Sequence, residues 1–204
     1  MNIGKIPAKT ARLSPHREAL VDIPNQRRMS YGELDERVRR LANALIDDLG
    51  LKKGDRVAIL SKNCIEYMEV YYACARSGLV PQPLNCRLGE EELSRILQDG
   101  DPAVVIASGE YATTQASLRE QVKAAHWFSF GAGGDGSYDV LVAQGSDREP
   151  PCSDSIGGDD PVLILYTGGT TGESKGALHT HHSLYMGMLN QTVAERVVPT
   201  DVYM

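Results

Sequence analysis

Short apolar runs alternate with amphipathic segments along this chain of 204 residues, and this alternation constrains its fold more than any other feature. The apolar runs have the length of buried strands, and the segments between them have the period of helices that cover a sheet. We expect strands at 56–60, 103–107, 126–130 and 162–165, and helices at 31–49, 64–77, 90–98, 113–125 and 138–143. This order predicts an α/β fold, in which a layered, largely parallel sheet is flanked by helices.

The helix expected at 31–49 has a defined start and two distinct faces. Ser30 and Glu33 form an S-x-x-E capping box, and Gly50 follows the last apolar position. Apolar residues at helical spacing form one face: Leu34, Val38, Leu41, Ala42, Leu45, Ile46 and Leu49. The other face carries a run of charges that we expect to be solvated: Glu36, Arg37, Arg39, Arg40, Asp47 and Asp48.

The helix expected at 64–77 is apolar almost all round, so we place it between two layers. Asn63 and Glu66 have the spacing of a second capping pattern at its start, and Gly78 is expected to end it. In the extended segment that follows, Pro81 and Pro83 lack the N–H groups of a fully paired strand, so it is not the centre of a sheet.

The ends of this organisation are less regular. Residues 1–29, punctuated by prolines, are expected to form an irregular segment with at most a short strand around 19–21. Residues 30–204 are expected to form one α/β unit. Within it, residues 144–160 are rich in Gly, Pro, Ser and Asp and form a surface connection.

A glycine-rich stretch of eleven residues, Tyr166–Gly176, follows the apolar run at 162–165 and precedes a segment with helical character. It holds four glycines, three threonines, one serine and one lysine. Glycines let several backbone N–H groups point at one anion, while hydroxyls and an ammonium add further donors. This composition favours binding of a polyphosphate over a plain surface turn. It is not a Walker motif, because Glu173 and Ser174 separate Gly172 from Lys175.

The stretch resembles the phosphate-binding loop of the adenylate-forming superfamily, which includes acyl-CoA synthetases, and that loop reads [YF]-T-S-G-T-T-G-x-P-K-G. Eight positions match: Tyr166, Thr167, Gly169, Thr170, Thr171, Gly172, Lys175 and Gly176. Thr180 and His181 stand where the family has a T-H pair. Gly168 replaces the family's serine, which removes a hydroxyl, and Ser174 replaces its proline, which leaves the turn before Lys175 less rigid.

The resemblance covers residues 30–204, which are similar to the first part of the adenylation domain, ending at the phosphate loop and the following helix. It implies an ATP-dependent acid–thiol ligase, in which a carboxylate attacks the α-phosphate of ATP, pyrophosphate leaves, and coenzyme A takes the acyl group. It implies that Lys175 stabilises the leaving pyrophosphate and that Mg²⁺ bridges the phosphates. The implied nucleotide-binding residues are Thr167, Gly168, Gly169, Thr170, Thr171, Gly172, Lys175 and His181, of which His181 either anchors the loop or contacts the reacting region.

Other motifs of the family have no counterpart in this chain: the acyl pocket, the ribose-binding aspartate, the hinge and the mobile C-terminal domain with its lysine. We therefore expect the chain alone to be inactive, with the coenzyme A site outside it. Two alternatives stay open. The chain could be a non-catalytic nucleotide-binding scaffold, or part of a peptide-synthetase module that loads an amino acid onto a carrier protein.

Composition excludes several other classes. A net charge of −6 with scattered basic residues argues against a nucleic-acid surface. No run approaches the roughly 18 apolar residues of a transmembrane helix, and the first residues lack the apolar core of a signal peptide, so we expect a cytoplasmic protein.

Cysteine and histidine spacing predicts neither a disulfide nor a metal site. The four cysteines, at 64, 74, 86 and 152, contain no C-x-x-C pair and are interpreted as core thiols. His179, His181 and His182 match no common zinc pattern. Because a sheet cut from a larger domain exposes strand edges and apolar helix surface, we expect a homodimer or larger assembly.

Overall fold

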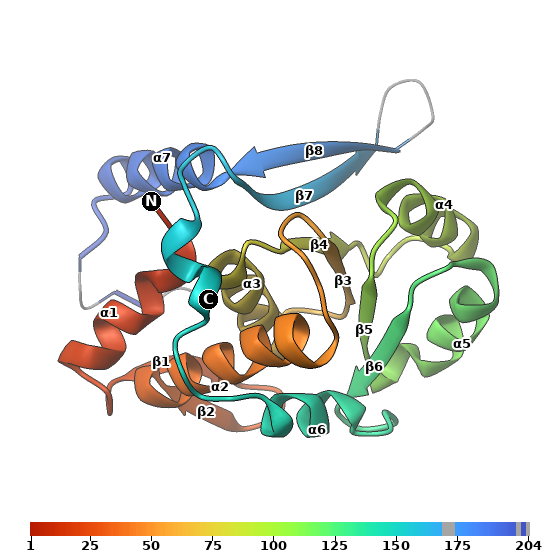
Figure 1. Cartoon of the computed structure of the whole chain (residues 1–204), viewed down its shortest axis with the longest axis horizontal. Coiled ribbons are helices and arrows are strands. Elements are labelled where there is room, and N and C mark those ends of the chain that lie inside the picture. The colour runs from red at the N-terminus through yellow and green to blue at the C-terminus, as the bar shows by residue number, and fades with distance from the viewer. Residues whose placement is uncertain (169–173, 199–200, 203–204) are drawn as a thin grey trace.

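The computed structural model describes residues 1–168, 174–198 and 201–202 and shows a four-stranded parallel sheet (Figure 1). Its strand order is β4-β3-β5-β6, with β3 (Arg56–Leu60), β4 (Val80–Leu84), β5 (Val104–Ser108) and β6 (His126–Phe130). All three pairings are parallel, which requires a crossover between successive strands. The predicted α/β fold is confirmed.

Helices cover both faces of this sheet (Figure 1). On one face lie α2 (Tyr31–Asn43), α3 (Ile65–Ser77) and α6 (Ser137–Gln144), and on the other lie α4 (Glu90–Gly100) and α5 (Ala112–Gln121). Val57 and Ile59 of β3 enter the first core, whereas Ala58 and Leu60 enter the second. This alternation follows from the two-residue period of a strand, and it explains why β3 is apolar throughout.

Three local signals in the sequence are confirmed. Ser30 and Glu33 form both hydrogen bonds of the capping box that opens α2. Gly78 ends α3 in the left-handed conformation, with φ of 78°. β4, which contains Pro81 and Pro83, lies at an edge of the four-stranded sheet. An edge strand tolerates proline because one of its sides needs no partner in the ladder.

The capping pattern predicted at Asn63 is wrong. The residue before α3 is Cys64, and its side chain makes no capping hydrogen bond. The carboxylate of Glu66 accepts two hydrogen bonds from the Arg27 guanidinium, at 2.6 and 2.8 Å, rather than capping the backbone at Asn63. A charged partner from a distant segment outcompetes the local backbone here.

Residues 1–29 are more regular than predicted, although the short strand expected around 19–21 is confirmed as β1. Residues Ile6–Leu13 form α1, and β1 (Glu18–Asp22) pairs with β2 (Arg27–Ser30) as an antiparallel hairpin. Pro7 lies in the first turn of α1, where its missing N–H costs nothing. Elements this short give a clear signal in the sequence only when they are apolar throughout, as β3 is, and tertiary contacts stabilise the others. One such contact is Gly4, since a Cβ there would lie 2.3 Å from the backbone nitrogen of Arg76.

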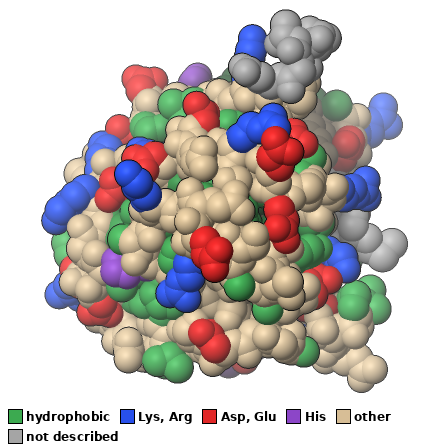
Figure 2. Space-filling model, turned by 90° about the vertical axis from the view of Figure 1, so that its right-hand side faces the viewer, with side chains coloured by type: hydrophobic (Ala, Val, Ile, Leu, Met, Phe, Trp, Pro, Cys, Tyr) green, Lys and Arg blue, Asp and Glu red, His purple; other side chains and the backbone are tan. Residues whose placement is uncertain are grey.

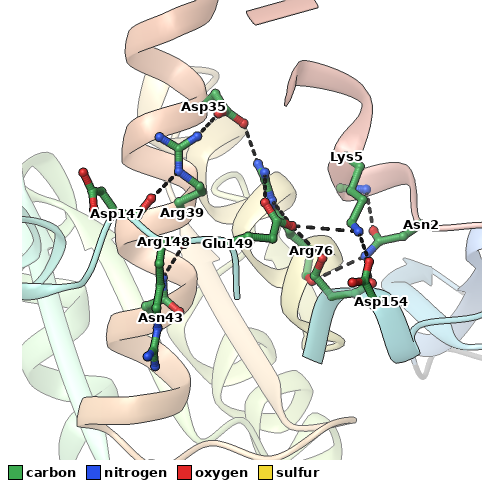
Figure 3. A network of polar contacts seen from close by, with 12 residues as sticks. Asn2, Lys5, Asp35, Arg39, Asn43, Arg76, Asp147, Arg148, Glu149 and Asp154 are labelled. Atoms are coloured by element: carbon green, nitrogen blue, oxygen red, sulfur yellow. Dashed lines mark hydrogen bonds and ion pairs between the residues drawn. The ribbon is translucent and has the colours of Figure 1, made fainter. Parts of the chain in front are cut away.

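An ion network joins α2, α3 and the connection after α6 (Figure 3). At its centre is Arg76, whose side chain is only 3% exposed. Its guanidinium pairs with Asp35 of α2 at 2.5 Å and with Glu149 of the connection. Arg39 pairs with the same Asp35. Lys5 reaches Asp154 at 2.5 Å, so the N-terminal segment is tied to the same region.

The charged face of α2 is solvated only in part, so that prediction needs correction. Glu36, Asp47 and Asp48 are exposed. Arg37, however, binds the buried Glu69 of α3, with N–O distances of 2.5 and 3.1 Å, and Glu69 also accepts a hydrogen bond from the Tyr138 hydroxyl at 2.7 Å. The reason is that α6 and the connection after it fold over this face of α2 (Figure 1).

After residue 160 the chain forms a separate antiparallel ribbon of β7 (Pro161–Gly168) and β8 (Ser174–Thr180), followed by α7 (His181–Ala194). The strand predicted at 162–165 is confirmed and extends to Gly168. A helical segment is expected directly after the glycine-rich stretch, but the structure has a strand there first. Residues 174–180 find backbone partners in β7, and the helix begins only at His181.

Candidate functional site

The tip of the β7–β8 ribbon carries the chemistry predicted for phosphate binding. Thr167 of β7 lies directly opposite Lys175 of β8, and Gly168 lies opposite Ser174. Thr167, Gly168 and Lys175 are exposed. A hydroxyl and an ammonium therefore lie side by side on two strands within the glycine-rich stretch. The predicted residues Gly169, Thr170, Thr171 and Gly172 lie outside the described residues.

The Lys175 ammonium takes no part in the ion pairs found in the described part of the chain. Lys5, Lys53 and Lys62, by contrast, each pair with a carboxylate. An exposed lysine that is not committed to a carboxylate keeps its three donors available to an anion. Lys175 thus has the accessibility that a phosphate contact needs.

Residues on the other face of the ribbon hold it against α4. The Tyr166 hydroxyl donates to Asp99 at 2.6 Å, and the Ser174 hydroxyl donates to Glu92 at 3.0 Å. Side chains alternate between the two faces of a strand, so fixing Tyr166 and Ser174 toward α4 turns their neighbours Thr167 and Lys175 the other way. Burial, reinforced by Asp99, raises the pKa of Tyr166, so its hydroxyl remains a donor at neutral pH.

Gly176 explains how the Tyr166 ring fits. It lies opposite Tyr166 in the ribbon, and a Cβ there would come within 3.1 Å of the tyrosine ring and 2.9 Å of the Ile164 side chain. Contacts this short require the neighbours to move. The glycine in the motif therefore leaves room for the side chains of Ile164 and Tyr166 on the facing strand.

His181 is placed away from the exposed face. It is the first residue of α7, its side chain is fully buried, and its Nδ1 accepts a hydrogen bond from the Ile3 backbone N–H at 3.1 Å. Burial lowers its pKa to about 4, against an opposing effect of Asp160, so the imidazole is neutral at pH 7. Because Nδ1 accepts, the proton lies on Nε2, which finds no partner among the described residues. The structure gives His181 a packing role, and its predicted nucleotide contact stays a prediction.

Two pockets border the ribbon. One, of about 490 Å³, lies between α4 and the ribbon, and its lining includes Glu91, Glu92, Asp99, Tyr166 and Ser174. The other, of about 270 Å³, is lined by aromatic and aliphatic side chains of α3, β4, α4 and β7, among them Tyr67, Tyr71 and Leu165. The face around α4 carries acidic and basic side chains interspersed (Figure 2).

The described residues offer little to a divalent cation by themselves. No group of three His, Cys, Asp or Glu side chains among them is placed to hold a metal ion. On the exposed face of the ribbon the described side chains nearest the glycine-rich stretch are a neutral hydroxyl and a cation. A Mg²⁺ ion here would take most of its ligands from phosphate oxygens and water, as Mg²⁺ commonly does at nucleotide sites.

All four cysteines are free thiols.

Glu92 and Asp99 were not found by sequence reasoning. They lie seven residues apart on α4, two turns along one face, so their shared direction could be read from spacing. Their partners could not, because Ser174 and Tyr166 are 82 and 67 residues away. Acidic residues in the first turn of a helix also have a local explanation in the helix dipole.

Comparison with known proteins shows what this chain is similar to. The family described as AMP-binding enzyme matches residues 8–204. A long-chain-fatty-acid–CoA ligase, FadD13 of Mycobacterium tuberculosis, is 36% identical over 184 residues, covering 90% of this chain and 36% of the ligase. Feruloyl-CoA synthase of an Amycolatopsis species is 38% identical over 191 residues, covering 94% and 36% respectively.

A solved structure agrees with these relatives. The ATP-bound crystal structure of MatB from Rhodopseudomonas palustris superimposes with a TM-score of 0.78 and 32% sequence identity, covering 98% of this chain and 39% of MatB. The chain thus spans little more than a third of the length of the relatives it matches.

Proposed function

The chain belongs to the AMP-binding enzymes, within the adenylate-forming superfamily of acyl-CoA ligases, and from this premise we propose that it carries the pyrophosphate-binding part of an ATP-dependent acid–thiol ligase. In that reaction a carboxylate attacks the α-phosphate of ATP and displaces pyrophosphate. The acyl-adenylate is then attacked by a thiol, which releases AMP. Coenzyme A is the favoured thiol, because the relatives named above are CoA ligases or synthases.

The observation that carries this proposal is the pairing of Thr167 with Lys175 on the exposed face of the ribbon. In the proposed reaction the Lys175 ammonium stabilises charge that builds on the departing pyrophosphate, and the Thr167 hydroxyl donates to a phosphate oxygen. The backbone N–H groups of the glycine-rich stretch would add further donors. Mg²⁺, when bound, would supply additional neutralisation of the phosphate charge.

Titration of the chain with inorganic pyrophosphate and with ATP, followed by calorimetry, tests the proposal. Lys175→Ala is expected to weaken pyrophosphate binding by roughly tenfold or more, as expected for loss of one charged donor. Lys123→Ala removes the same charge from an exposed position on another part of the surface and is the matched control. Equal affinity in both variants would refute the assignment of the loop.

The same substitution separates the two half-reactions when the chain is part of an active ligase. Lys175→Ala should lower the rate of adenylation by about 10²-fold, the scale for removing one preorganised donor. Thiolysis of an added acyl-adenylate should change much less, because no pyrophosphate leaves in that step. An equal loss in both would mean that Lys175 supports folding.

We also propose that the chain by itself exchanges no pyrophosphate into ATP. One loop holds only the phosphate tail, whereas reaction requires both reactants to be held in a near-attack arrangement. Clear carboxylate-dependent exchange by the 204-residue chain would overturn this.

We keep the cytoplasm as the proposed location. In the part of the chain that the structure describes, no helix has the length and apolar character to cross a bilayer.

Self-association is the proposed partner interaction. α7 contains no Asp, Glu, Lys or Arg. Leu184 and Tyr185 of α7 pack inward. Several other apolar side chains of β8 and α7 are exposed: Leu178, Met186, Met188, Leu189 and Val193. A helix that is apolar on several sides is usually covered. Light scattering should detect a dimer or larger species, and a monomer at high concentration would contradict the proposal.

A further inference from the structure

Helix α4 holds the ribbon at two points, one on each strand. Ser174 of β8 bonds to Glu92 near the start of the helix, and Tyr166 of β7 bonds to Asp99 near its end. The two carboxylates face the same way, two turns apart. Both strands that enter and leave the glycine-rich stretch are therefore fixed to one rigid element.

Ser174 occupies an informative position. It is the residue immediately before Lys175, and it is where the family motif has a proline. Proline fixes φ and so limits the motion of the backbone at this point. Serine leaves φ free but provides a hydroxyl, and here that hydroxyl is bound to the half-buried Glu92 at 3.0 Å. The hydrogen bond restrains the same backbone position by a different means.

We propose that Glu92 is a positioning residue for the phosphate loop: through Ser174 it fixes the backbone that presents Lys175 to the departing pyrophosphate. This inference rests on the proposed function. Glu92 does not pair with the Lys175 ammonium, because Ser174 and Lys175 project to opposite faces of β8. Its effect is orientation, so its loss should weaken pyrophosphate binding without unfolding the chain.

Amide hydrogen exchange in the absence of ligand tests the restraint itself. Glu92→Ala should accelerate exchange at Lys175 and Gly176 by roughly tenfold, the scale of one hydrogen bond to a charged group. Glu92→Gln keeps an acceptor oxygen for the serine hydroxyl and should stay close to the parent. Glu90→Ala removes an exposed charge from the same turn of α4 and is the matched control. Unchanged exchange at Lys175 in Glu92→Ala would overturn the inference.

Calorimetric titration with inorganic pyrophosphate tests the link to function. Glu92→Ala and Ser174→Ala should each weaken binding by the same factor, roughly tenfold, and the double variant by no more than either alone, since one hydrogen bond is lost in all three. Ser174→Pro, which introduces the family residue, should restore affinity in the Glu92→Ala background. A merely structural role for Glu92 would not produce this rescue.

The two measurements separate the possible failures. If Lys175→Ala weakens pyrophosphate binding and Glu92→Ala does not, the positioning role is refuted while the proposed function stands. If the parent chain binds no pyrophosphate although Glu92→Ala accelerates exchange, the restraint has no role in phosphate binding, and both the positioning role and the proposed function fail.

Discussion

The ion network around Arg76 and the open ribbon around Lys175 both depend on a basic side chain, but one side chain stabilises the fold and the other is exposed to solvent. Arg76 is buried, and its guanidinium is committed to two carboxylates from segments far away in the sequence. Lys175 is exposed and makes none of the ion pairs found among the described residues. A buried charge must be paired, and pairing fixes the surrounding backbone. An exposed charge contributes little to stability, which leaves it free to bind a ligand.

The largest expected effect is on the buried side of this comparison. Arg76→Ala removes the buried guanidinium that Asp35 and Glu149 share; Asp35 keeps Arg39, but loss of the buried member of such a network should still cost about 3–5 kcal/mol of unfolding free energy. Urea denaturation measures it. Arg28→Ala, which breaks the exposed pair with Glu18, should cost about 1 kcal/mol or less. Equal losses would show that burial does not distinguish the two pairs.

A pH dependence comes next. His181 has a folded pKa of about 4 against about 6.5 when unfolded, because burial disfavours the charged imidazole. Below pH 6.5 the unfolded state therefore binds more protons, so stability falls as the pH drops from about 6.5 toward 4. The limiting slope is about 1.4 kcal/mol per pH unit.

Urea denaturation of the parent chain and of His181→Gln, at pH 7 and pH 5, measures this term as a difference. The glutamine oxygen can still accept from Ile3 but does not titrate, so the variant should lose less stability on acidification. Glu149 contributes in another window: burial raises its pKa, but the Arg76 and Ser153 hydrogen bonds outweigh this and lower it. Its contribution is lost only as the pH falls below about 4.5. If the parent chain and His181→Gln lost the same unfolding free energy between pH 7 and pH 5, the pKa of His181 would not differ between the folded and unfolded states.

A smaller effect is expected from a single buried hydroxyl. Tyr138→Phe removes the 2.7 Å hydrogen bond to Glu69, which should cost about 1.5–3 kcal/mol because the acceptor is charged. Glu69 keeps its Arg37 partner, so the loss should stay below that of Arg76→Ala. Tyr71→Phe is the control, because Tyr71 lines a pocket and its hydroxyl makes none of the hydrogen bonds found among the described residues. A larger loss in Tyr71→Phe would contradict the ranking.

The smallest effect is expected on the open side. Lys175→Ala and Thr167→Ala should each change the unfolding free energy by no more than about 0.5 kcal/mol, since both side chains are exposed. Thermal denaturation without ligand measures this. A loss above about 1 kcal/mol would show that the ribbon face takes part in the fold.

Sequence reasoning succeeded where a local rule determines structure. Ser30 and Glu33 cap α2 because four residues contain the whole motif, and β3 is recognisable because a strand covered on both faces must be apolar. The same logic found the strand before the glycine-rich stretch, which extends from Pro161 to Gly168, whereas the phosphate-binding role of the stretch stays a prediction.

Prediction failed where distant charges decide the outcome. Glu66 has the spacing of a cap, but Arg27 takes its carboxylate. Arg37 has the pattern of a solvated face, but Glu69 and Asp139 bind it from other elements. Glu92 has the pattern of an ordinary acidic residue in the first turn of a helix, but the Ser174 hydroxyl of the ribbon donates to it. Helical periodicity states which side of an element a residue lies on and does not state what will cover that side.

The hydrogen bond from Ile3 to His181 has a consequence for synthesis of the chain. Its two residues are 178 positions apart, and other partners of the N-terminal segment, such as Arg76 and Ser153, are 74 and 151 positions away. At roughly 5–20 residues per second, a ribosome needs on the order of 10–35 s to reach the histidine after making the isoleucine. A segment that is made early is thus among the last to complete its native contacts. Until β7 has been made, Ile3 lacks Val162 and Leu163 of its buried cluster, so this cluster closes only late in synthesis.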